Sequence, residues 1–204
     1  MTSKQILDKA NGQIKRYFSE DTINKIERIL GYTFKNKQLL IQAFLKQPIE
    51  ITEPDGSTME INNDSLEFIG DRILYSIITI NYTEVNMKKC SNGFIRLPRA
   101  SSFSKYVMKH STNEKWLNIM NTKHIKNVKN WLVVGNNVDL KVNNLKSSKV
   151  FADLFEAIFG ALAIDCNYDM NQLRYSFNAV LVRKHGCGLL KLIESSKKTA
   201  HLDF

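Results

Sequence analysis

The sequence predicts a single all-α domain, and three observations support this prediction. The chain has 204 residues, a length typical of one domain with a short appendage. It holds only nine glycines and three prolines, so few residues interrupt helices. Apolar residues also recur at helical spacing in segments bounded by capping residues and turn residues.

The first 85 residues contain four predicted helices. Ser19 is placed to cap the second helix at its start, and Gly31 is placed to end it. Pro48 ends the third helix, and the turn cluster Pro-Asp-Gly-Ser that follows predicts a long loop. The four helices cover residues 3–18, 20–30, 37–45 and 64–85, with the loop over 46–62 before the last of them.

The rest of the chain contains four more predicted helices, of which the one over 149–165 is strongly apolar. Ser91 is a candidate cap for a helix that runs from Gly93 towards Lys109, with an irregular start at Pro98. A short extended piece is expected at 131–134, within the polar and basic segment 121–147. These helices cover residues 93–109, 116–120, 149–165 (with Ser148 as its candidate cap) and 171–184, and Gly186 and Gly188 follow the last one.

The composition favours a nucleic-acid partner over other classes. The net charge is +9, and basic domains commonly bind polyanions. No apolar stretch reaches the roughly 18 residues of a membrane span, and no secretory signal opens the chain, so we expect an intracellular protein of the nucleus or cytoplasm without a membrane partner. Cys90, Cys166 and Cys187 are far apart, which predicts neither a zinc site nor a redox pair.

Two pairs of carboxylates lie inside apolar helices. Glu67 and Asp71 are four residues apart, and Asp153 and Glu156 are three apart, so each pair shares one face of its helix. Taken singly, each pair is also compatible with a solvated face. Like charges beside apolar residues repel at a high cost unless a cation compensates them. Two such pairs in the two most apolar helices therefore predict a cation site.

The chemistry of these residues favours a hard divalent ion. All-oxygen sites suit Mg²⁺, with Mn²⁺ as a substitute. Small residues at Gly70, Gly160 and Ala161 would let the two helices approach closely, so that all four carboxylates converge. None of the four histidines has a glutamate three residues before it, which excludes the di-iron helical bundle. Carboxylates around divalent ions on a basic protein point to phosphodiester hydrolysis.

Several segments, in chain order, resemble the ribonuclease III family. Residues 63–71, Asn-Asp-Ser-Leu-Glu-Phe-Ile-Gly-Asp, are similar to its signature, and residues 149–165 are similar to its second acidic helix. Residues 30–44 are similar to its opening, and residues 93–107 match its middle helix more loosely. The likeness covers roughly residues 22–182.

This resemblance implies a ribonuclease III-type helical endonuclease domain. Family members cut double-stranded RNA with magnesium as all-α dimers, and they leave 5′-phosphates and short 3′ overhangs. By motif position, Asp64 matches a further acidic residue that supports the site or faces the RNA, and Phe68 matches an aromatic residue of the dimer interface. The residues that match the catalytic, metal-binding set are Glu67, Asp71, Asp153 and Glu156.

The chain also departs from the family pattern. Arg72 stands where a small residue is usual, Ser65 replaces an arginine, and the usual Thr-His segment after the opening helix is missing. We expect an N-terminal helical extension over 1–20, a catalytic domain over 21–184 and a short tail over 185–204, with no double-stranded-RNA-binding domain. This organisation resembles a minimal eukaryotic, Dicer-like enzyme that acts in RNA processing or RNA silencing.

Two alternatives remain open at this point. The chain could be an inactive ribonuclease III-like subunit that binds double-stranded RNA, although loss of an acid would mark that class and all four are present. It could also be an unrelated helical nucleic-acid-binding domain. No small-molecule cofactor is expected. The candidate RNA contacts, each more often a solvated charge, are Arg96, Arg99, Lys105, Lys109, Lys123, Lys126, Lys129 and Lys146.

Overall fold

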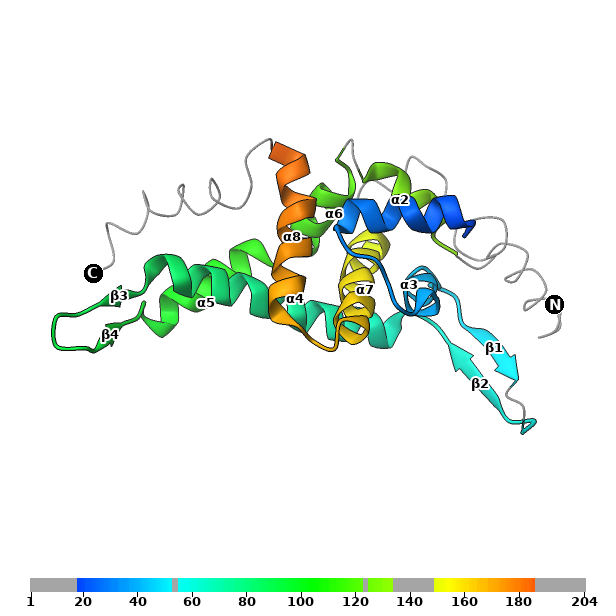
Figure 1. The fold of residues 1–204 in the computed structure, drawn as a ribbon, viewed down its shortest axis with the longest axis horizontal. Coiled ribbons are helices and arrows are strands. Elements are labelled where there is room, and N and C mark those ends of the chain that lie inside the picture. The colour runs from blue at the N-terminus through cyan, green and yellow to red at the C-terminus, as the bar shows by residue number, and fades with distance from the viewer. Residues whose placement is uncertain (1–17, 53–54, 123–124, 134–148, 186–204) are drawn as a thin grey trace.

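The structure is a computed structural model that describes residues 18–52, 55–122, 125–133 and 149–185. Most of these residues are helical, which confirms the all-α prediction (Figure 1). None of the described helices is both long enough and apolar enough to cross a membrane. The helices are α2 (Glu20–Leu30), α3 (Lys37–Ala43), α4 (Asp64–Asn86), α5 (Ala100–His110), α6 (Asn113–Met120), the 3₁₀ helix η1 (Lys126–Trp131), α7 (Lys149–Asp165) and α8 (Met170–His185).

Helix α7 is the centre of the core. Nearly every side chain from Phe151 to Asp165 is buried, as expected for a helix that is apolar on all sides. Helix α4 is its main partner, and α3 and α6 also pack against it. Trp116 of α6 stacks on Phe155 of α7, with ring centroids 5.3 Å apart. The acids of α7 are thus carried by the most enclosed helix among the described elements.

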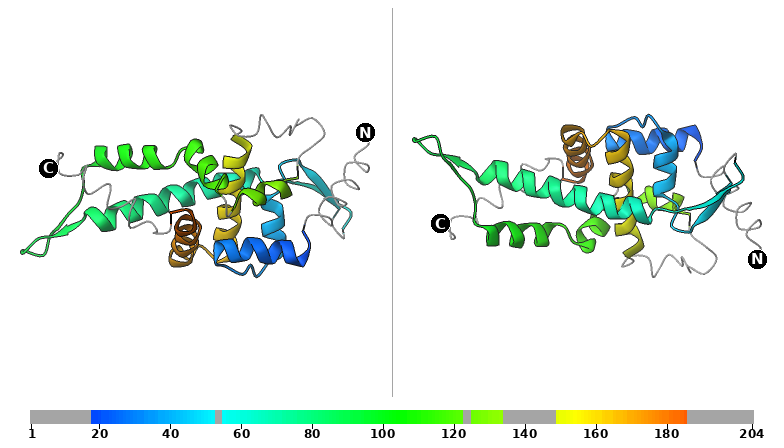
Figure 2. Two further views of the ribbon diagram at one scale, coloured as in Figure 1. Left: turned by 90° about the horizontal axis from the view of Figure 1, so that it is seen from above. Right: turned by 90° about the horizontal axis from the view of Figure 1, so that it is seen from below.

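Helix α4 is the longest of the described helices, and its second half extends away from this core. There it runs beside α5, and the two form an arm that Figure 2 shows from above and from below. Tyr82 of α4 stacks on Tyr106 of α5, with ring centroids 4.3 Å apart. The first half of α4 therefore belongs to the core, and the second half supports the arm.

The caps predicted for the second helix are confirmed. The Ser19 hydroxyl accepts a hydrogen bond from the Thr22 N–H, and Gly31 ends α2 with a φ of 63°. The loop that follows is fixed by Asp165 of α7, whose carboxylate accepts the N–H groups of Lys35 and Asn36 at 2.7 and 2.8 Å. This anchors α2 and α3 to the end of α7.

Two short hairpins correct the expected secondary structure. The segment 46–62 contains the antiparallel strands β1 (Ile49–Thr52) and β2 (Thr58–Ile61), which pair from Ile49 with Ile61. Apolar Ile49 and Ile51 flank polar Glu50, an alternation that is typical of a strand with one buried face. The structure agrees, since Ile49 is buried at the edge of the core.

The second hairpin replaces the start of the helix predicted over 93–109. Strands β3 (Lys88–Lys89) and β4 (Ile95–Arg96) form it, and α5 begins only at Ala100, two residues after Pro98. Gly93 has a φ of 86° and lies in the turn, so neither it nor Ser91 starts a helix. Figure 1 places the two hairpins at opposite ends of the molecule.

The remaining helix boundaries agree with expectation to within a few residues. The 3₁₀ helix η1 was not predicted, and it includes Trp131, the first residue of the piece predicted as extended over 131–134. Val133, in the piece predicted as extended, forms an isolated parallel bridge with Leu45. Several predictions lie outside the described residues. These are the helix predicted over 3–18, except for Phe18, and nearly all of the predicted tail. The single residues outside them are Lys123, Lys146, Ser148, Gly186, Cys187 and Gly188.

Candidate metal centre and active site

Four acidic side chains meet where α4 and α7 cross. Glu67 and Asp71 lie on α4, and Asp153 and Glu156 lie on α7. The two helices touch backbone to backbone at Gly70 and Gly160, with no side chain between them. The close approach that the small residues predicted is therefore present at these two glycines.

Three of the four predicted acids form a compact oxygen cluster. One carboxylate oxygen from each of Glu67, Asp153 and Glu156 lies within 4.8 Å of the others. Asp153 and Glu156 are buried, and Glu67 is half-buried. Asp71 lies outside this trio but is close enough for its charge to act on Glu156. We define Glu67, Asp153 and Glu156 as the acidic trio.

Burial and mutual repulsion disturb the titration of the trio. Burial, together with the charges of Asp71, Asp153 and Glu67, raises the pKa of Glu156 to about 8. Burial and the charge of Glu67 also raise the pKa of Asp153, although two lysines oppose this shift. A divalent cation bound between these carboxylates would offset the repulsion between their negative charges and favour their ionised forms.

The donor atoms of the trio suit a divalent metal ion. All are carboxylate oxygens, which Mg²⁺ and Mn²⁺ prefer. The Oδ1 atom of Asp153 is buried and accepts no hydrogen bond from the described residues, and the exposed Lys149 ammonium lies 3.4 Å from it. A buried carboxylate oxygen with only this long ion pair is costly, and a divalent ion beside it would remove that cost. The residues therefore fit the metal that the sequence predicts.

Two lysines approach the trio, and sequence reasoning missed both of them as site residues. The Nζ atom of Lys46 lies 3.1 Å from Glu67 and 3.3 Å from Asp153. The Nζ atom of Lys149 lies 3.5 Å from Glu67 and 3.4 Å from Asp153. Burial lowers the pKa of Lys46, but the two carboxylates outweigh it and the net pKa is raised. One sequence signal pointed to Lys46: it begins the 46–62 loop, which stands where family members usually have a Thr-His segment.

Asp64 lies at the rim of the site, at the start of α4. Its carboxylate accepts a hydrogen bond from the Asn62 side chain at 2.9 Å and is 3.5 Å from the Lys46 ammonium. Its side chain is mostly exposed, unlike those of the trio. This position is compatible with the supporting or RNA-facing role predicted for it.

Phe68 points out of the chain and is not a core residue. It is 64% exposed, and the Arg72 guanidinium lies 5.3 Å from the centre of its ring. Arg72 also lies 3.5 Å from the Asp71 carboxylate. Tyr75, two turns after Phe68, is exposed on the same face of α4. We call Phe68, Arg72 and Tyr75 the α4 stripe.

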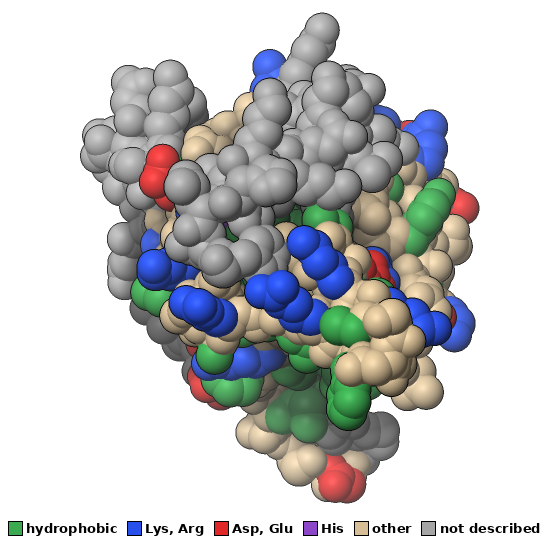
Figure 3. Space-filling model, turned by 90° about the vertical axis from the view of Figure 1, so that its left-hand side faces the viewer, with side chains coloured by type: hydrophobic (Ala, Val, Ile, Leu, Met, Phe, Trp, Pro, Cys, Tyr) green, Lys and Arg blue, Asp and Glu red, His purple; other side chains and the backbone are tan. Residues whose placement is uncertain are grey.

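Four of the candidate RNA contacts are exposed on α5 and on the segment before it. Arg96 belongs to β4, Arg99 precedes α5, and Lys105 and Lys109 lie on α5. Figure 3 shows lysine and arginine side chains gathered with apolar ones on this end of the molecule.

Of the candidates in the basic segment, the structure describes Lys126 and Lys129. Lys126 is exposed. Lys129 lies 4.7 Å from the centre of the Phe151 ring and hydrogen-bonds Asn121, so it contributes to packing as well as charge.

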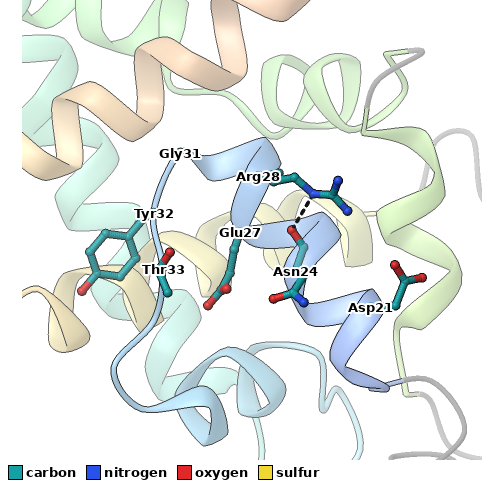
Figure 4. A pocket seen from close by; sticks show the side chains of 7 residues that line it. All are labelled: Asp21, Asn24, Glu27, Arg28, Gly31, Tyr32 and Thr33. Atoms are coloured by element: carbon teal, nitrogen blue, oxygen red, sulfur yellow. Dashed lines mark hydrogen bonds between the residues drawn. The ribbon is translucent and has the colours of Figure 1, made fainter.

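A separate polar depression lies on α2 and contains none of the predicted site residues (Figure 4). Its Glu27 carboxylate accepts the Phe34 N–H at 2.7 Å and pairs with Lys37. The Arg28 side chain donates to the Asn24 carbonyl at 3.2 Å. These contacts support a structural role. The lining residues are Asp21, Asn24, Glu27, Arg28, Gly31, Tyr32 and Thr33.

The fold is similar to that of solved nuclease domains. One is the nuclease domain of ribonuclease III from Campylobacter jejuni, in a structure that describes flexibility in a region involved in dimer formation. It superposes on this chain with a TM-score of 0.57 at 21% sequence identity. The match covers 80% of this chain and 99% of the Campylobacter domain. A second structure of that domain gives a TM-score of 0.54 at 22% identity, with 77% and 92% covered. Identities this low support the fold alone.

Curated relatives carry the name ribonuclease 3. The protein from Roseburia hominis is 29% identical over 189 residues, which cover 79% of this chain and 47% of the relative. The protein from Treponema succinifaciens is 30% identical over 179 residues, which cover 86% and 45%. Ribonuclease 3-like protein 3 of Arabidopsis thaliana is 30% identical over 169 residues, which cover 79% and 16%. The chain thus spans about half the length of the two bacterial relatives, or less.

The sequence profile of the Ribonuclease III domain matches residues 64–167. This range includes both acidic helices, all four predicted acids and the α4 stripe. The chain belongs to the ribonuclease III family.

Proposed function

We propose that this chain is an endoribonuclease that hydrolyses phosphodiester bonds of double-stranded RNA with the help of Mg²⁺, for which Mn²⁺ can substitute. The observation that carries this proposal is the acidic trio, in which one carboxylate oxygen from each residue lies within 4.8 Å of the others at the crossing of two helices. Family membership supports the reaction class. We further propose that the cleavage products carry 5′-phosphates and short 3′ overhangs, and that the enzyme acts in RNA processing or RNA silencing.

In this proposal the acidic carboxylates bind the metal ion and the two helices position them. Glu67, Asp153 and Glu156 would hold the ion, with Asp71 beside them at the edge. A divalent ion held there supplies the Lewis-acid chemistry that activates water and neutralises charge that develops on a phosphate. The helices α4 and α7 fix the carboxylates in place before the substrate arrives, since both belong to the packed core.

The proposed substrate is supported by charge. The net charge of +9 would attract the phosphates of RNA, and Arg96, Arg99, Lys105 and Lys109 are exposed on the arm. An A-form duplex offers a wide minor groove with 2′-hydroxyl groups, so we expect recognition by shape and not by sequence.

The proposed active form is a homodimer. Phe68 is a large apolar side chain left exposed on α4, and Tyr75 continues the same face. Exposed aromatic residues of this kind are typical anchors of protein interfaces. A two-fold dimer that used the α4 stripe on both chains would present two acid clusters to one duplex.

Cleavage of a long RNA duplex tests this proposal. Purified protein should shorten the duplex in Mg²⁺ and leave it intact in EDTA, and end analysis should find 5′-phosphates. A DNA duplex of the same sequence is the control and should stay uncut. RNA binding without cleavage in Mg²⁺ would instead support the inactive binding subunit.

A further inference from the structure

Lys46 occupies the acidic site from a connection between α3 and β1. Its ammonium nitrogen lies 3.1 Å from Glu67 Oε2, 3.3 Å from Asp153 Oδ2 and 3.5 Å from Asp64 Oδ1. Glu67 belongs to α4 and Asp153 to α7, so one ammonium group bridges the two helices that form the site. Its side chain is only 25% exposed, which is low for a lysine.

The backbone at Lys46 is held by the surrounding fold. The Lys46 N–H donates to the Val133 carbonyl at 3.0 Å, and the Val133 N–H donates to the Phe44 carbonyl at 2.8 Å. On the other side, the Asn63 N–H donates to the Leu45 carbonyl at 2.9 Å. These bonds fix the base of the side chain beside the trio. The backbone of Lys46 is therefore fixed where its side chain can reach Glu67 and Asp153, unlike that of a lysine on a mobile surface loop.

The two ammonium groups form ion pairs with only two members of the trio. Lys46 and Lys149 both contact Glu67 and Asp153, whereas no lysine or arginine of the described residues forms an ion pair with Glu156. Lys149 is 67% exposed, so water weakens its contribution. Lys46 is thus the main partner of the Glu67 and Asp153 carboxylates, which are also two of the three candidate metal ligands.

We propose that Lys46 is a positioning residue that takes the place of the divalent cation in the metal-free protein. It holds the Glu67 and Asp153 carboxylates together, and an incoming ion competes with it for their oxygens. This inference rests on the proposed function, since it takes the trio as the metal site. It implies that Lys46 stabilises the metal-free fold and at the same time weakens metal binding.

Removal of the charge should therefore change two properties in opposite directions. Lys46→Met keeps an unbranched apolar stem but lacks the ammonium group. We expect it to bind Mn²⁺ about tenfold more tightly or better, because a positive charge roughly 4 Å from the ion strongly opposes binding at a partly buried site. In EDTA the same variant should melt at a lower temperature than wild type, because the carboxylates lose their partner.

Calorimetric titration with Mn²⁺ and thermal melts in EDTA and in Mn²⁺ test this inference. The proteins are wild type, Lys46→Met, Lys46→Arg and Lys25→Met. Lys46→Arg keeps the charge and should stay within about threefold of the wild-type affinity. Lys25 forms an exposed pair with Asp21 on α2, so Lys25→Met should match wild type in both measurements. Cleavage by Lys46→Met should also reach half its maximum at a lower metal concentration.

The outcomes separate this inference from the proposed function. Equal Mn²⁺ affinities for wild type and Lys46→Met would overturn the inference and leave the metal site standing. Binding to Lys46→Met but not to wild type would support it. Absence of binding to both would overturn the metal site and the inference together. If Lys46→Met does not fold in EDTA, recovery of its melting transition with Mn²⁺ supports the inference, and failure to recover overturns it.

Discussion

Gly70 and Gly160 lie against each other's helices at the crossing of α4 and α7. A Cβ atom added to Gly70 would lie 1.7 Å from the Glu156 carbonyl oxygen, and one added to Gly160 would lie 2.0 Å from the Leu66 carbonyl oxygen. Both neighbours are backbone atoms, which cannot turn aside. The convergence of the acids thus depends on the absence of two side chains.

Gly70→Ala should therefore be severely destabilising. The helices would have to separate, and we expect a loss of about 3 kcal/mol or more in the free energy of unfolding. Gly56→Ala is the control, since Gly56 has a φ of 85° and nothing within 4 Å of an added Cβ. That change should cost only about 1–2 kcal/mol, from backbone strain. Equal denaturant midpoints for the two variants would contradict the close crossing.

The stability of the metal-free protein should fall as pH rises. The folded-state pKa of Glu156 is about 8, above its ordinary value of 4.5, so the fold favours the protonated carboxyl. Its contribution to stability is complete below pH 4.5 and is lost as pH rises to about 8. Glu156→Gln should flatten this decline, measured by urea denaturation in EDTA between pH 6 and pH 9. A decline as steep as that of wild type would show that Glu156 is not its source.

Mg²⁺ should reverse this loss, because it binds only the folded site. At about 100 times its dissociation constant it would add roughly 2.7 kcal/mol of stability. The gain should be smaller for Glu156→Gln, which removes one ligand. A melting curve that Mg²⁺ leaves unchanged at every pH would argue against a preformed site.

Phe68→Ala should shift the protein towards the monomer. The phenylalanine is mostly exposed in the single chain, so its removal should weaken an interface by about 2 kcal/mol or more with little effect on folding. Phe94→Ala is the matched control, because Phe94 is even more exposed but lies in the β3–β4 hairpin turn. Sedimentation over a range of concentrations measures both. If Phe68→Ala dimerises as wild type does, the α4 stripe is not the interface.

RNA binding should be steeply sensitive to salt. Each phosphate contact releases a counterion, so replacing Lys105 and Lys109 with alanine should reduce the slope of log affinity against log salt concentration by about one to two. Lys25→Ala, on α2, should leave the slope unchanged. Filter binding of a duplex RNA between low and moderate salt gives the slopes. An unchanged slope for the α5 variant would place the RNA elsewhere.

Local signals were enough to predict most of the helical fold. Ser19 and Gly31 bound α2 because capping depends on residues close in sequence. Helix α7 was predicted over its full length, Lys149–Asp165, from a continuous apolar pattern. The hairpin at 88–96 was missed because its strands are only two residues long and carry no clear alternation.

The candidate site was predictable to the extent that it depends on helix faces. Spacing placed Glu67 with Asp71 and Asp153 with Glu156, but the exact trio depends on how α4 and α7 cross, which leaves Asp71 at the edge. Lys46 could not be predicted as a site residue, since its position depends on backbone bonds to distant Val133. Contacts of that kind have no local sequence signal.

The most direct test of the account compares cleavage and binding of duplex RNA by wild type and Glu156→Gln. The substitution removes one candidate metal ligand from the acidic trio and leaves the exposed basic residues of the arm in place. We predict that cleavage in Mg²⁺ is lost while the affinity for duplex RNA, measured in parallel, is kept. Cleavage by Glu156→Gln at the wild-type rate would contradict the assignment of α4 and α7 as the catalytic metal centre.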